Sequence, residues 1–339
     1  MNRTVFKVKA PSTLKGLQQK QEAIPELQEN ELRIQVRAIG LNFADIFAIH
    51  GMYSATPKEE FIPGLEFSGV VMATGNKKMK YKVGDRVFGV TRFGAYADHL
   101  HVNEFEIYPL PKTWSFEEGA ALPAQTLTAY YALYVLGNLQ KNDAVLIHSM
   151  AGGVGIRALE MVKKQKAIAI GTVGNPQKIE HLRAFLPDLV VSRTENWATK
   201  VQEFCRHHNI SISHCLESIG GDVYKQSYEL LGRNSKMIVF GSASLNPQSI
   251  SDVLLLPFRY WRRPILDPLS MISENKSVMG FNLIWMWDKI EEFPKYMDQI
   301  FKMNLSKPIV GKIFSFTQMH QAIEHLKSGS SIGKVIVRI

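Results

Sequence analysis

The stretch that decides the fold runs over residues 144–156 and reads AVLIHSMAGGVGI. Its apolar start predicts a buried strand, its glycines predict a tight turn, and the run that follows predicts a helix. In this pattern Gly155 lets the helix lie close to the strand, and backbone groups of the turn approach a dinucleotide pyrophosphate at the helix N-terminus. The predicted cofactor-binding residues of the turn are Gly152, Gly153, Val154 and Gly155. Met150 replaces the first glycine of the usual pattern, so glycines with a purely structural role are the alternative interpretation.

Further strand–helix units follow this first one along the chain. We expect strands at residues 144–148, 167–173, 189–192, 213–217 and 236–240, with helices at 154–166, 176–185, 197–208 and 223–231. Near-continuous apolar strands alternating with helices predict an α/β fold with a parallel, doubly wound sheet. A sixth strand is expected at 277–283, after a long irregular insertion at 245–276. It would be an apolar edge strand, and such an edge invites pairing with a second copy.

The flanking sequence has a different character. Short alternating segments at residues 31–37, 64–74, 83–90 and 95–102 predict a β-rich domain. The C-terminal part returns to this style, with an amphipathic helix at 289–302, a helix capped by Thr317, and a closing strand at 334–339. We therefore expect one domain at 1–122 with 288–339 and a second at 123–287.

The end of the second parallel strand selects the nucleotide. An NAD site commonly has an acidic residue about 20 residues after the glycine turn, where it binds the ribose hydroxyls. Here residues 171–178 read GTVGNPQK and contain no acid. Lys178, and Arg193 after the third strand, are able to attract a 2′-phosphate, and Gly174 in the same segment is a further predicted cofactor-binding residue. The missing acid favours NADPH (NADP), although a solvated lysine is the alternative interpretation for Lys178.

Composition limits the class of protein. The chain has 339 residues, a net charge of +9 and two cysteines, Cys205 and Cys215. Two cysteines cannot build a disulfide framework or a four-cysteine zinc lobe. The sequence contains no apolar run near the ~20 residues of a membrane span. Its N-terminus lacks the apolar segment of a secretory signal, so we expect a soluble cytoplasmic protein.

The glycine turn combines with other motifs into a family resemblance that covers essentially the whole chain. These motifs are NFAD (42–45), PGLEFSG (63–69) and VGDRV (83–87). Together they resemble the medium-chain dehydrogenase/reductase superfamily, and within it the zinc-independent quinone oxidoreductases. The segment with RP (263–264), DP (267–268) and NKSVMGFNL (275–283) is similar to the vesicle amine transport protein branch. The resemblance implies a GroES-like β-rich catalytic domain, a Rossmann domain and a homodimer.

Departures from the zinc-dependent relatives concern the metal. Those relatives take zinc ligands from positions that correspond to Asn42, Leu65 and a residue near Ala124. None of the three residues here provides a Cys or His ligand, so we expect no metal site. Without a Lewis acid, hydride transfer suits an acceptor that delocalises charge, such as a quinone or an enone.

The resemblance also implies site residues. Asn42 and Thr128 are expected near the nicotinamide, and Tyr53 is the candidate for contact with the acceptor. An aromatic packed between domains is an equally good interpretation of Tyr53. Three places are expected for the remaining predicted cofactor residues. Ser218 is expected towards the adenosine, Phe240 and Gly241 at the far edge of the cofactor, and Phe281 along an apolar slot.

Two functions compete at this point. The first is a zinc-independent oxidoreductase that transfers hydride from NADPH to a quinone or other conjugated carbonyl. The second is a cofactor-binding protein that acts mainly on RNA or a membrane surface, suggested by the net charge and by the run RYWRR at 259–263. A solvated loop with its aromatic side chains tucked beneath it is the favoured interpretation of that run.

Overall fold

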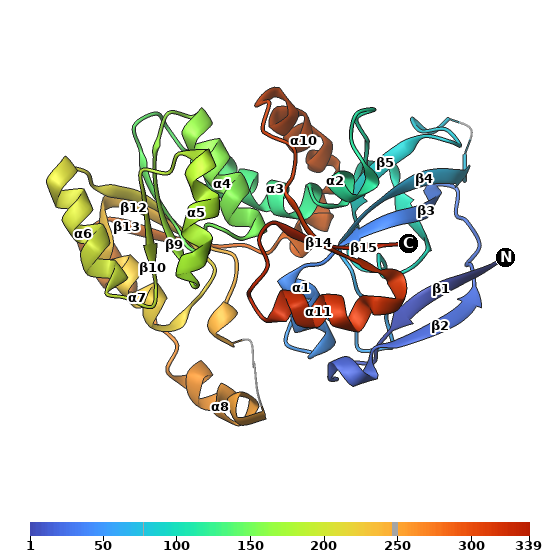
Figure 1. The fold of residues 1–339 in the computed structure, drawn as a ribbon, viewed down its shortest axis with the longest axis horizontal. Helices are drawn as coiled ribbons and strands as arrows, with labels where there is room; N and C mark the ends of the chain where they lie inside the picture. Colours follow the sequence, from blue (N-terminus) through green and yellow to red (C-terminus); the bar gives the residue numbers. More distant parts are fainter. Residues whose placement is uncertain (77, 246–249) are drawn as a thin grey trace. The chain divides into compact units, whose positions relative to one another are not determined.

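A computed structural model describes residues 1–76, 78–245 and 250–339 (Figure 1). The chain divides into two compact units. Unit 1 contains residues 1–127, 283–299 and 307–339, and unit 2 contains residues 128–282 and 300–306. Each unit has its own sheet and is described by itself.

Unit 2 is built on a six-stranded parallel sheet in the order β10-β9-β8-β11-β12-β13. The strands are β8 (Ala144–Ile147), β9 (Ile168–Val173), β10 (Leu189–Ser192), β11 (Ile212–Glu217), β12 (Leu231–Val239) and β13 (Lys276–Gly280). This is the strand order of dinucleotide-binding folds, with a switch point beside the first strand β8. The predicted parallel sheet and the edge position of its last strand are confirmed.

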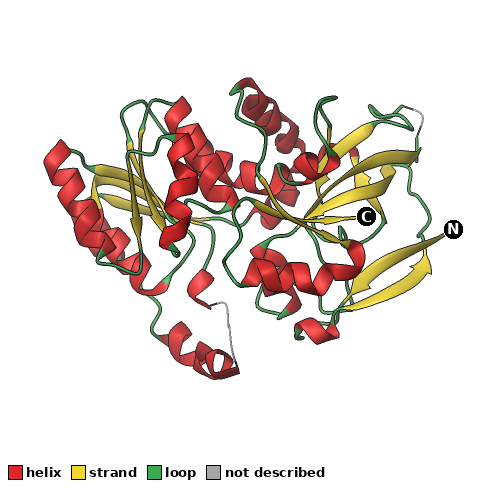
Figure 2. Ribbon diagram, in the orientation of Figure 1, coloured by secondary structure: helices red, strands yellow, loops and turns green. Residues whose placement is uncertain are grey.

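Helices cover both faces of this sheet (Figures 1 and 2). They are α4 (Gly153–Lys164), α5 (Ile179–Leu182), α6 (Trp197–His208) and α7 (Gly221–Leu230). Short 3₁₀ turns, Pro176–Lys178 and Arg183–Phe185, flank α5, so the long helix expected at 176–185 is broken. The π-helix Tyr131–Leu136 continues from α3 (Pro123–Tyr130). The buried strand residues and the apolar faces of α6 and α7 form a common core.

The expectation of an irregular insertion at 245–276 is wrong for most of that segment. After a 3₁₀ turn at Ala243–Leu245, the segment contains two helices, α8 (Ile250–Trp261) and α9 (Pro268–Glu274), while 246–249 lie outside the described residues. Pro257 inside α8 hides the helix from sequence reasoning, whereas α9 has a regular start with Asp267 as its N-cap. The tucked aromatics expected in the RYWRR run are also wrong, since Tyr260 and Trp261 are 57% and 76% exposed.

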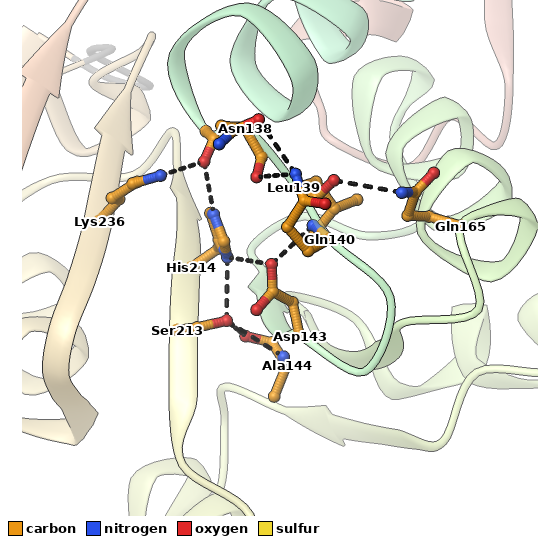
Figure 3. A network of polar contacts seen from close by, with 10 residues as sticks. Asn138, Leu139, Gln140, Asp143, Ala144, Gln165, Ser213, His214 and Lys236 are labelled. Atoms are coloured by element: carbon orange, nitrogen blue, oxygen red, sulfur yellow. Dashed lines mark hydrogen bonds and ion pairs between the residues drawn. The ribbon is translucent and has the colours of Figure 1, made fainter.

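A network near the amino ends of β8 and β11 joins the π-helix to the sheet (Figure 3). The carbonyl oxygen of Gly137, at the C-terminal end of the π-helix, accepts hydrogen bonds from His214 Nε2 at 2.9 Å and from Lys236 Nζ. His214 Nδ1 lies 2.9 Å from the Ser213 hydroxyl. Burial lowers the pKa of His214, so the ring is held neutral as part of the scaffold.

Unit 1 contains a seven-stranded, mostly antiparallel sheet in the order β14-β15-β3-β4-β5-β7, with β6 also paired to β3. The strands are β3 (Glu31–Gly40), β4 (Glu66–Thr74), β5 (Arg86–Val90), β6 (His99–Asn103), β7 (Ile107–Pro109), β14 (Val310–Ser315) and β15 (Lys334–Arg338). A separate hairpin pairs β1 (Asn2–Lys7) with β2 (Gln18–Ala23). Alternating side chains of these strands fill one large hydrophobic core, as the sequence pattern predicts.

The helices of unit 1 are short. They are α1 (Phe43–Ile49), α2 (Phe116–Ala120) and α11 (Met319–Lys327), with 3₁₀ turns at Leu14–Gly16, Glu104–Glu106, Leu283–Glu292 and Phe316–Gln318. The helix expected at 289–302 begins only at Phe293, as α10 (Phe293–Lys302). The cap assigned to Thr317 is wrong, because Gln318 is the N-cap of α11 and makes no side-chain cap hydrogen bond. Ser315 is the N-cap of the preceding 3₁₀ turn, where its backbone N–H donates to Gln318 Oε1.

Candidate active site

The glycine turn between β8 and α4 has the geometry that a pyrophosphate requires. A Cβ on Gly155 would lie 2.4 Å from the carbonyl oxygen of Ser149, so only glycine allows α4 to start this close to the strand. Gly152 precedes the helix with an extended backbone. The space where its side chain would be is open apart from Ser149 O, which would lie 3.1 Å from a Cβ at this position. The turn therefore leaves the first N–H groups of a 12-residue helix available for an anion.

The buried position of the Met150 side chain shows why the turn does not need a glycine here. The Met150 side chain is fully buried, and its sulfur would lie 2.2 Å from a Cβ on Gly171 in β9. Gly171 thus provides the space for the methionine, while the backbone N–H of Met150 donates to Thr172 O at 3.0 Å. The side chain packs into the sheet, so it leaves the pyrophosphate side of the turn clear.

Two cations lie at the carboxyl ends of β9 and β10. Arg193 Nη1 donates to Thr172 Oγ1 at 2.8 Å, and Arg193 Nη2 lies 3.1 Å from where a Gly174 Cβ would be. Burial, with the positive charge of Arg193 as a second cause, lowers the pKa of Lys178. Burial also lowers the pKa of Arg193, which the charge of Glu217 partly offsets. Two half-buried cations that repel each other favour an anion, and Gly174 keeps the space beside them open.

A chain of hydrogen bonds fixes the position of the Arg193 side chain. Ser227 donates its hydroxyl to Val223 O at 2.6 Å, so it accepts from His148 Nε2–H at 2.7 Å. The other ring nitrogen, Nδ1, then accepts from the Thr172 hydroxyl at 2.8 Å. Because the Thr172 oxygen in turn accepts from Arg193, the chain has one consistent direction and positions the guanidinium.

His148, in this chain of hydrogen bonds, makes the free energy of unfolding depend on pH. Burial lowers the pKa of His148 to about 3, against an ordinary value of 6.5. The stability that neutral His148 provides is complete above pH 6.5 and is lost as pH falls from 6.5 towards 3, because only the unfolded chain takes up the proton there. The loss should reach on the order of 4 kcal/mol.

Urea unfolding of the wild type and of His148→Asn over this pH range measures the effect. The variant cannot titrate, so its stability should fall less steeply than that of the wild type. Subtracting the two curves removes the opposite effect of Asp45, whose pKa burial raises to about 7. Parallel curves would contradict the assignment.

The predicted residues at the carboxyl ends of β11, β12 and β13 lie together. A Cβ on Gly241 would lie 3.1 Å from Ser218 O, so these two residues are in contact. The rings of Phe240 and Phe281 are 6.0 Å apart, and Tyr131 lies 5.0 Å from Phe281. Carboxyl ends of parallel strands are where such sheets bind ligands.

The catalytic candidates divide between the units. Thr128 is a half-buried residue of α3 in unit 2, three residues before Tyr131. Asn42 and Tyr53 both belong to unit 1. Tyr53 is partly buried and packs against the hydrophobic core of its own unit, so a packing role is an observed feature of this side chain.

Asn42 precedes α1 and is held by charged side chains. Its Nδ2 donates to Glu66 Oε1 at 2.8 Å, and its Oδ1 accepts from Lys334 Nζ at 2.6 Å. Glu66 and Lys334 form an ion pair and are 0% and 5% exposed. Asp45 accepts from the Asn42 backbone N–H at 2.8 Å and from the Tyr96 hydroxyl at 3.0 Å, so the half-buried Asn42 is surrounded by buried polar groups of unit 1.

Sequence reasoning missed three of these residues. Tyr131 has a signal, since it follows Thr128 at helical spacing. Glu66 stands in the quoted PGLEFSG motif, and Lys334 is a lysine at the start of the closing strand, directly before the apolar run 335–337. A charged residue in such a strand needs a buried partner, which the pattern does not name.

Metal ligands do not gather in the part of the chain that is described. In residues 1–76, 78–245 and 250–339, no group of three or more His, Cys, Asp or Glu side chains is placed to hold a metal ion. Asn42, where zinc-dependent relatives have a ligand, is instead engaged with Glu66 and Lys334.

Comparison with known proteins places this architecture in a family. Residues 28–112 match the model of the alcohol dehydrogenase GroES-like domain, and residues 188–337 match the model of the zinc-binding dehydrogenases. The chain belongs to the medium-chain dehydrogenase/reductase superfamily. The resemblance, the β-rich GroES-like unit and the Rossmann unit expected from the sequence are thereby confirmed.

Individual relatives come from the vesicle-protein and quinone oxidoreductase branches. The chain is 29% identical over 317 residues to a synaptic vesicle membrane protein VAT-1 homolog of Danio rerio, covering 92% of this chain and 65% of the relative. Against the Homo sapiens VAT-1 homolog, identity is 27%, with 95% of this chain and 82% of the relative covered. The chain thus spans less than two thirds of the length of the Danio rerio relative.

Solved structures agree on the fold. Escherichia coli quinone oxidoreductase complexed with NADPH superimposes with a TM-score of 0.86 at 24% identity, covering 100% of both chains. The quinone oxidoreductase of Thermus thermophilus, whose structures include a complex with NADPH, gives a TM-score of 0.78 at 25% identity, covering 99% of this chain and 100% of that one. Among the described residues of the present chain, no helix combines the length and the apolar character that crossing a bilayer requires.

Proposed function

We propose that this protein is an NADPH-dependent oxidoreductase that reduces a quinone or another conjugated carbonyl. The observation that carries the proposal is the pair Arg193 and Lys178 beside the open Gly174, at the carboxyl end of a strand followed by no acid. A 2′-phosphate is the group that distinguishes NADPH from NADH, and it is an anion that two cations would bind. The Thermus thermophilus and Escherichia coli quinone oxidoreductases, both solved in complex with NADPH, support the same cofactor.

The residues present fit this cofactor, which when bound would supply the hydride. Gly152 to Gly155 would hold the pyrophosphate on helix N–H groups, and Ser218 with Gly241 would line the adjacent part of the site. The aromatic rings of Tyr131, Phe240 and Phe281 would provide an apolar wall that excludes water. Asn42, Tyr53 and Thr128 remain the proposed residues around the reacting groups.

The acceptor follows from the chemistry that the chain provides. At the positions of zinc ligands in zinc-dependent relatives it has Asn42, Leu65 and Ala124. Quinones and enones spread the developing negative charge over a conjugated system, so hydrogen bonds are sufficient to stabilise it.

Steady-state oxidation of NADPH with a panel of quinones and enones tests the proposal. We expect turnover with at least one acceptor of this class, and clearly slower turnover with NADH. Saturated ketones and aldehydes serve as the control acceptors, because their reduction depends on polarising an isolated carbonyl. Binding of NADPH without turnover of any acceptor would overturn the proposed reductase activity.

A homodimer is a further proposal. β13 is the edge strand of the unit 2 sheet, and its unpaired side offers backbone groups to a second copy. Light scattering at micromolar concentration should give twice the chain mass. A monomer mass would contradict the dimer while leaving the proposed reaction untouched.

A membrane surface is the second candidate function, because the C-terminal end of α8 and the segment after it expose apolar side chains beside arginines. Trp261, Ile265, Leu269 and Ile272 are between 72% and 86% exposed. Arg263 lies 4.2 Å from the ring of Tyr260, and Arg262 lies 5.5 Å from the ring of Phe258. Exposed aromatics among arginines suit the interface of an anionic bilayer.

Co-sedimentation with anionic and neutral vesicles tests this second function. Binding to anionic vesicles that weakens with salt, and is lost in Trp261→Ser/Arg263→Ser, would support it, whereas weak, salt-independent binding would exclude it. Salt-sensitive binding to RNA and not to vesicles would assign the region to nucleic acid instead. The cytoplasmic location is proposed with the reductase function, and fractionation of cells into soluble and membrane fractions tests it.

A further inference from the structure

A cavity of about 340 Å³ opens within unit 1, among side chains that the proposed reductase function does not use. Its apolar side is formed by Ile62, Phe93 and Leu100. Exposed residues of the loop after β2 also line it, so the cavity is open to solvent. Small-molecule sites have volumes of about 300–1,000 Å³ and combine apolar walls with a few polar groups. The polar groups here come from three strands: Arg3 of β1, Glu31 of β3 and His101 of β6.

His101 is a fixed, neutral part of this cavity. Arg33 Nε–H donates to His101 Nε2 at 3.1 Å, so Nε2 is the accepting nitrogen and the ring proton is on Nδ1. That nitrogen lies 3.3 Å from Glu31 Oε2. Burial lowers the pKa of His101, which Glu31 partly offsets, while the charges of Arg33 and Arg3 lower it further. Both ring nitrogens are thus engaged, and the imidazole holds the Glu31 carboxylate in place.

Glu31 has one carboxylate oxygen left for a ligand. Its Oε2 faces His101 and also accepts from the Gln28 backbone N–H at 3.0 Å. In the part of the chain that the structure describes, Oε1 has no hydrogen-bond partner. The cavity therefore contains a positioned anionic acceptor.

Arg3 supplies hydrogen-bond donors on the same cavity. Its Nε and Nη2 donate to Glu22 Oε1 at 3.0 and 2.7 Å, and its Nη1 donates to His99 O at 3.2 Å. A guanidinium has five N–H groups, and the other two have no partner among the described residues. The side chain is only 12% exposed, so these contacts hold the cation in one place.

The charges at the cavity favour a ligand that has one charge of each sign. Arg3 and Glu31 both act on the His101 ring, so the two charged groups are near neighbours. A ligand with a single charge would bury that charge and leave one of these two groups without a partner. The ionised groups that line the cavity or contact its lining balance one another: Arg3, Lys7 and Arg33 are cations, and Glu22, Glu26 and Glu31 are anions.

We propose that this cavity binds a free α-amino acid with an apolar side chain. Its carboxylate would accept from Arg3, its ammonium group would donate to Glu31 Oε1, and its side chain would pack against the apolar side of the cavity. A single carbon joins the two charged groups of an α-amino acid, which suits a cation and an anion that act on one imidazole. The site lies within one unit, and none of the predicted cofactor residues lines it.

Three ligands of nearly the same shape test the proposal by calorimetric and saturation-transfer NMR titration of the wild-type chain. They are L-leucine, 4-methylpentanoate, which lacks the ammonium group, and 3-methylbutylamine, which lacks the carboxylate. Leucine should bind at least tenfold more tightly than either analogue, because each analogue loses one charge-assisted hydrogen bond. Glycine should also bind more weakly than leucine, because it has no side chain to bury.

Two variants separate the roles of the charged groups. Glu31→Gln keeps an oxygen for His101 but turns an N–H towards the ammonium group, so leucine should lose its advantage over 4-methylpentanoate. Arg3→Met removes the donors to the carboxylate, so leucine should lose its advantage over 3-methylbutylamine. Glu22 keeps Lys7 as an ion-pair partner in Arg3→Met, so unit 1 should stay folded.

The matched controls change exposed residues of the same unit. Glu60→Gln removes a carboxylate from the exposed ion pair with Lys20, and Arg37→Met removes an exposed arginine of β3. Both should keep the wild-type order of affinities, and urea midpoints of all four variants show which of them fold normally.

The results that would overturn the proposal need no variant. If leucine does not bind the wild type at millimolar concentration, the site is not an amino-acid site. If 4-methylpentanoate or 3-methylbutylamine binds as tightly as leucine, the cavity does not recognise both charges. If Arg3→Met lowers the urea midpoint, Glu31→Gln decides by itself, and an unchanged order of affinities in that variant would overturn the role of Glu31.

Discussion

Removing the two cations at the end of β9 and β10 should abolish the preference for NADPH. In Lys178→Met/Arg193→Met the affinity for NADPH should fall by about 100-fold or more, since hydrogen bonds from charged groups contribute roughly 1.5–3 kcal/mol each. The affinity for NADH should change little, because NADH has no 2′-phosphate for these side chains to contact. Calorimetric titration of both nucleotides measures the two affinities directly.

The matched control has the same change of charge elsewhere in unit 2. Lys164→Met/Arg183→Met removes two exposed cations, one of them at the far end of the 12-residue helix α4. It should leave the NADPH affinity within about twofold, because salt and water screen exposed charges. An equal loss of NADH and NADPH affinity in Lys178→Met/Arg193→Met would show that the cations serve the pyrophosphate or the fold, and not the 2′-phosphate.

Lys334→Met should destabilise unit 1 strongly. It leaves the carboxylate of Glu66, which is 0% exposed, facing the neutral donors of Asn42 and Ala124 without its cationic partner. Breaking a buried ion pair by removing one partner costs about 3–5 kcal/mol. Urea unfolding followed by tryptophan fluorescence measures the loss.

Two comparisons show where this loss comes from. Lys20→Met removes an exposed lysine from its pair with Glu60 and should cost less than about 1 kcal/mol. Glu66→Gln/Lys334→Met removes both buried charges and should recover most of the stability. A loss in Lys334→Met no larger than in Lys20→Met would contradict the buried ion pair.

The parallel sheet could be predicted because its signals are local. The apolar strand before Gly152, the glycines of the turn and the helical run after them lie within 13 residues. Packing follows from such a pattern almost without regard to the rest of the chain. The same holds for the apolar faces of α10 and α11, whose buried residues recur at helical spacing.

The environment of Asn42 could not be predicted in this way. Lys334 is separated from Asn42 by 292 residues, and only the pairing of β15 with β3 brings the two together. The exposed RYWRR run fails for another reason. Helical periodicity shows which residues share a face, but it does not show whether another element covers that face, and Tyr260 and Trp261 are exposed.

The most direct test of the central claim is the equilibrium affinity of the unmodified chain for NADPH and NADH, measured side by side at low and at physiological salt. We expect NADPH to bind at least tenfold more tightly than NADH, and the difference to shrink as salt screens Lys178 and Arg193. Equal affinities at both salt concentrations, or tighter binding of NADH, would contradict the claim.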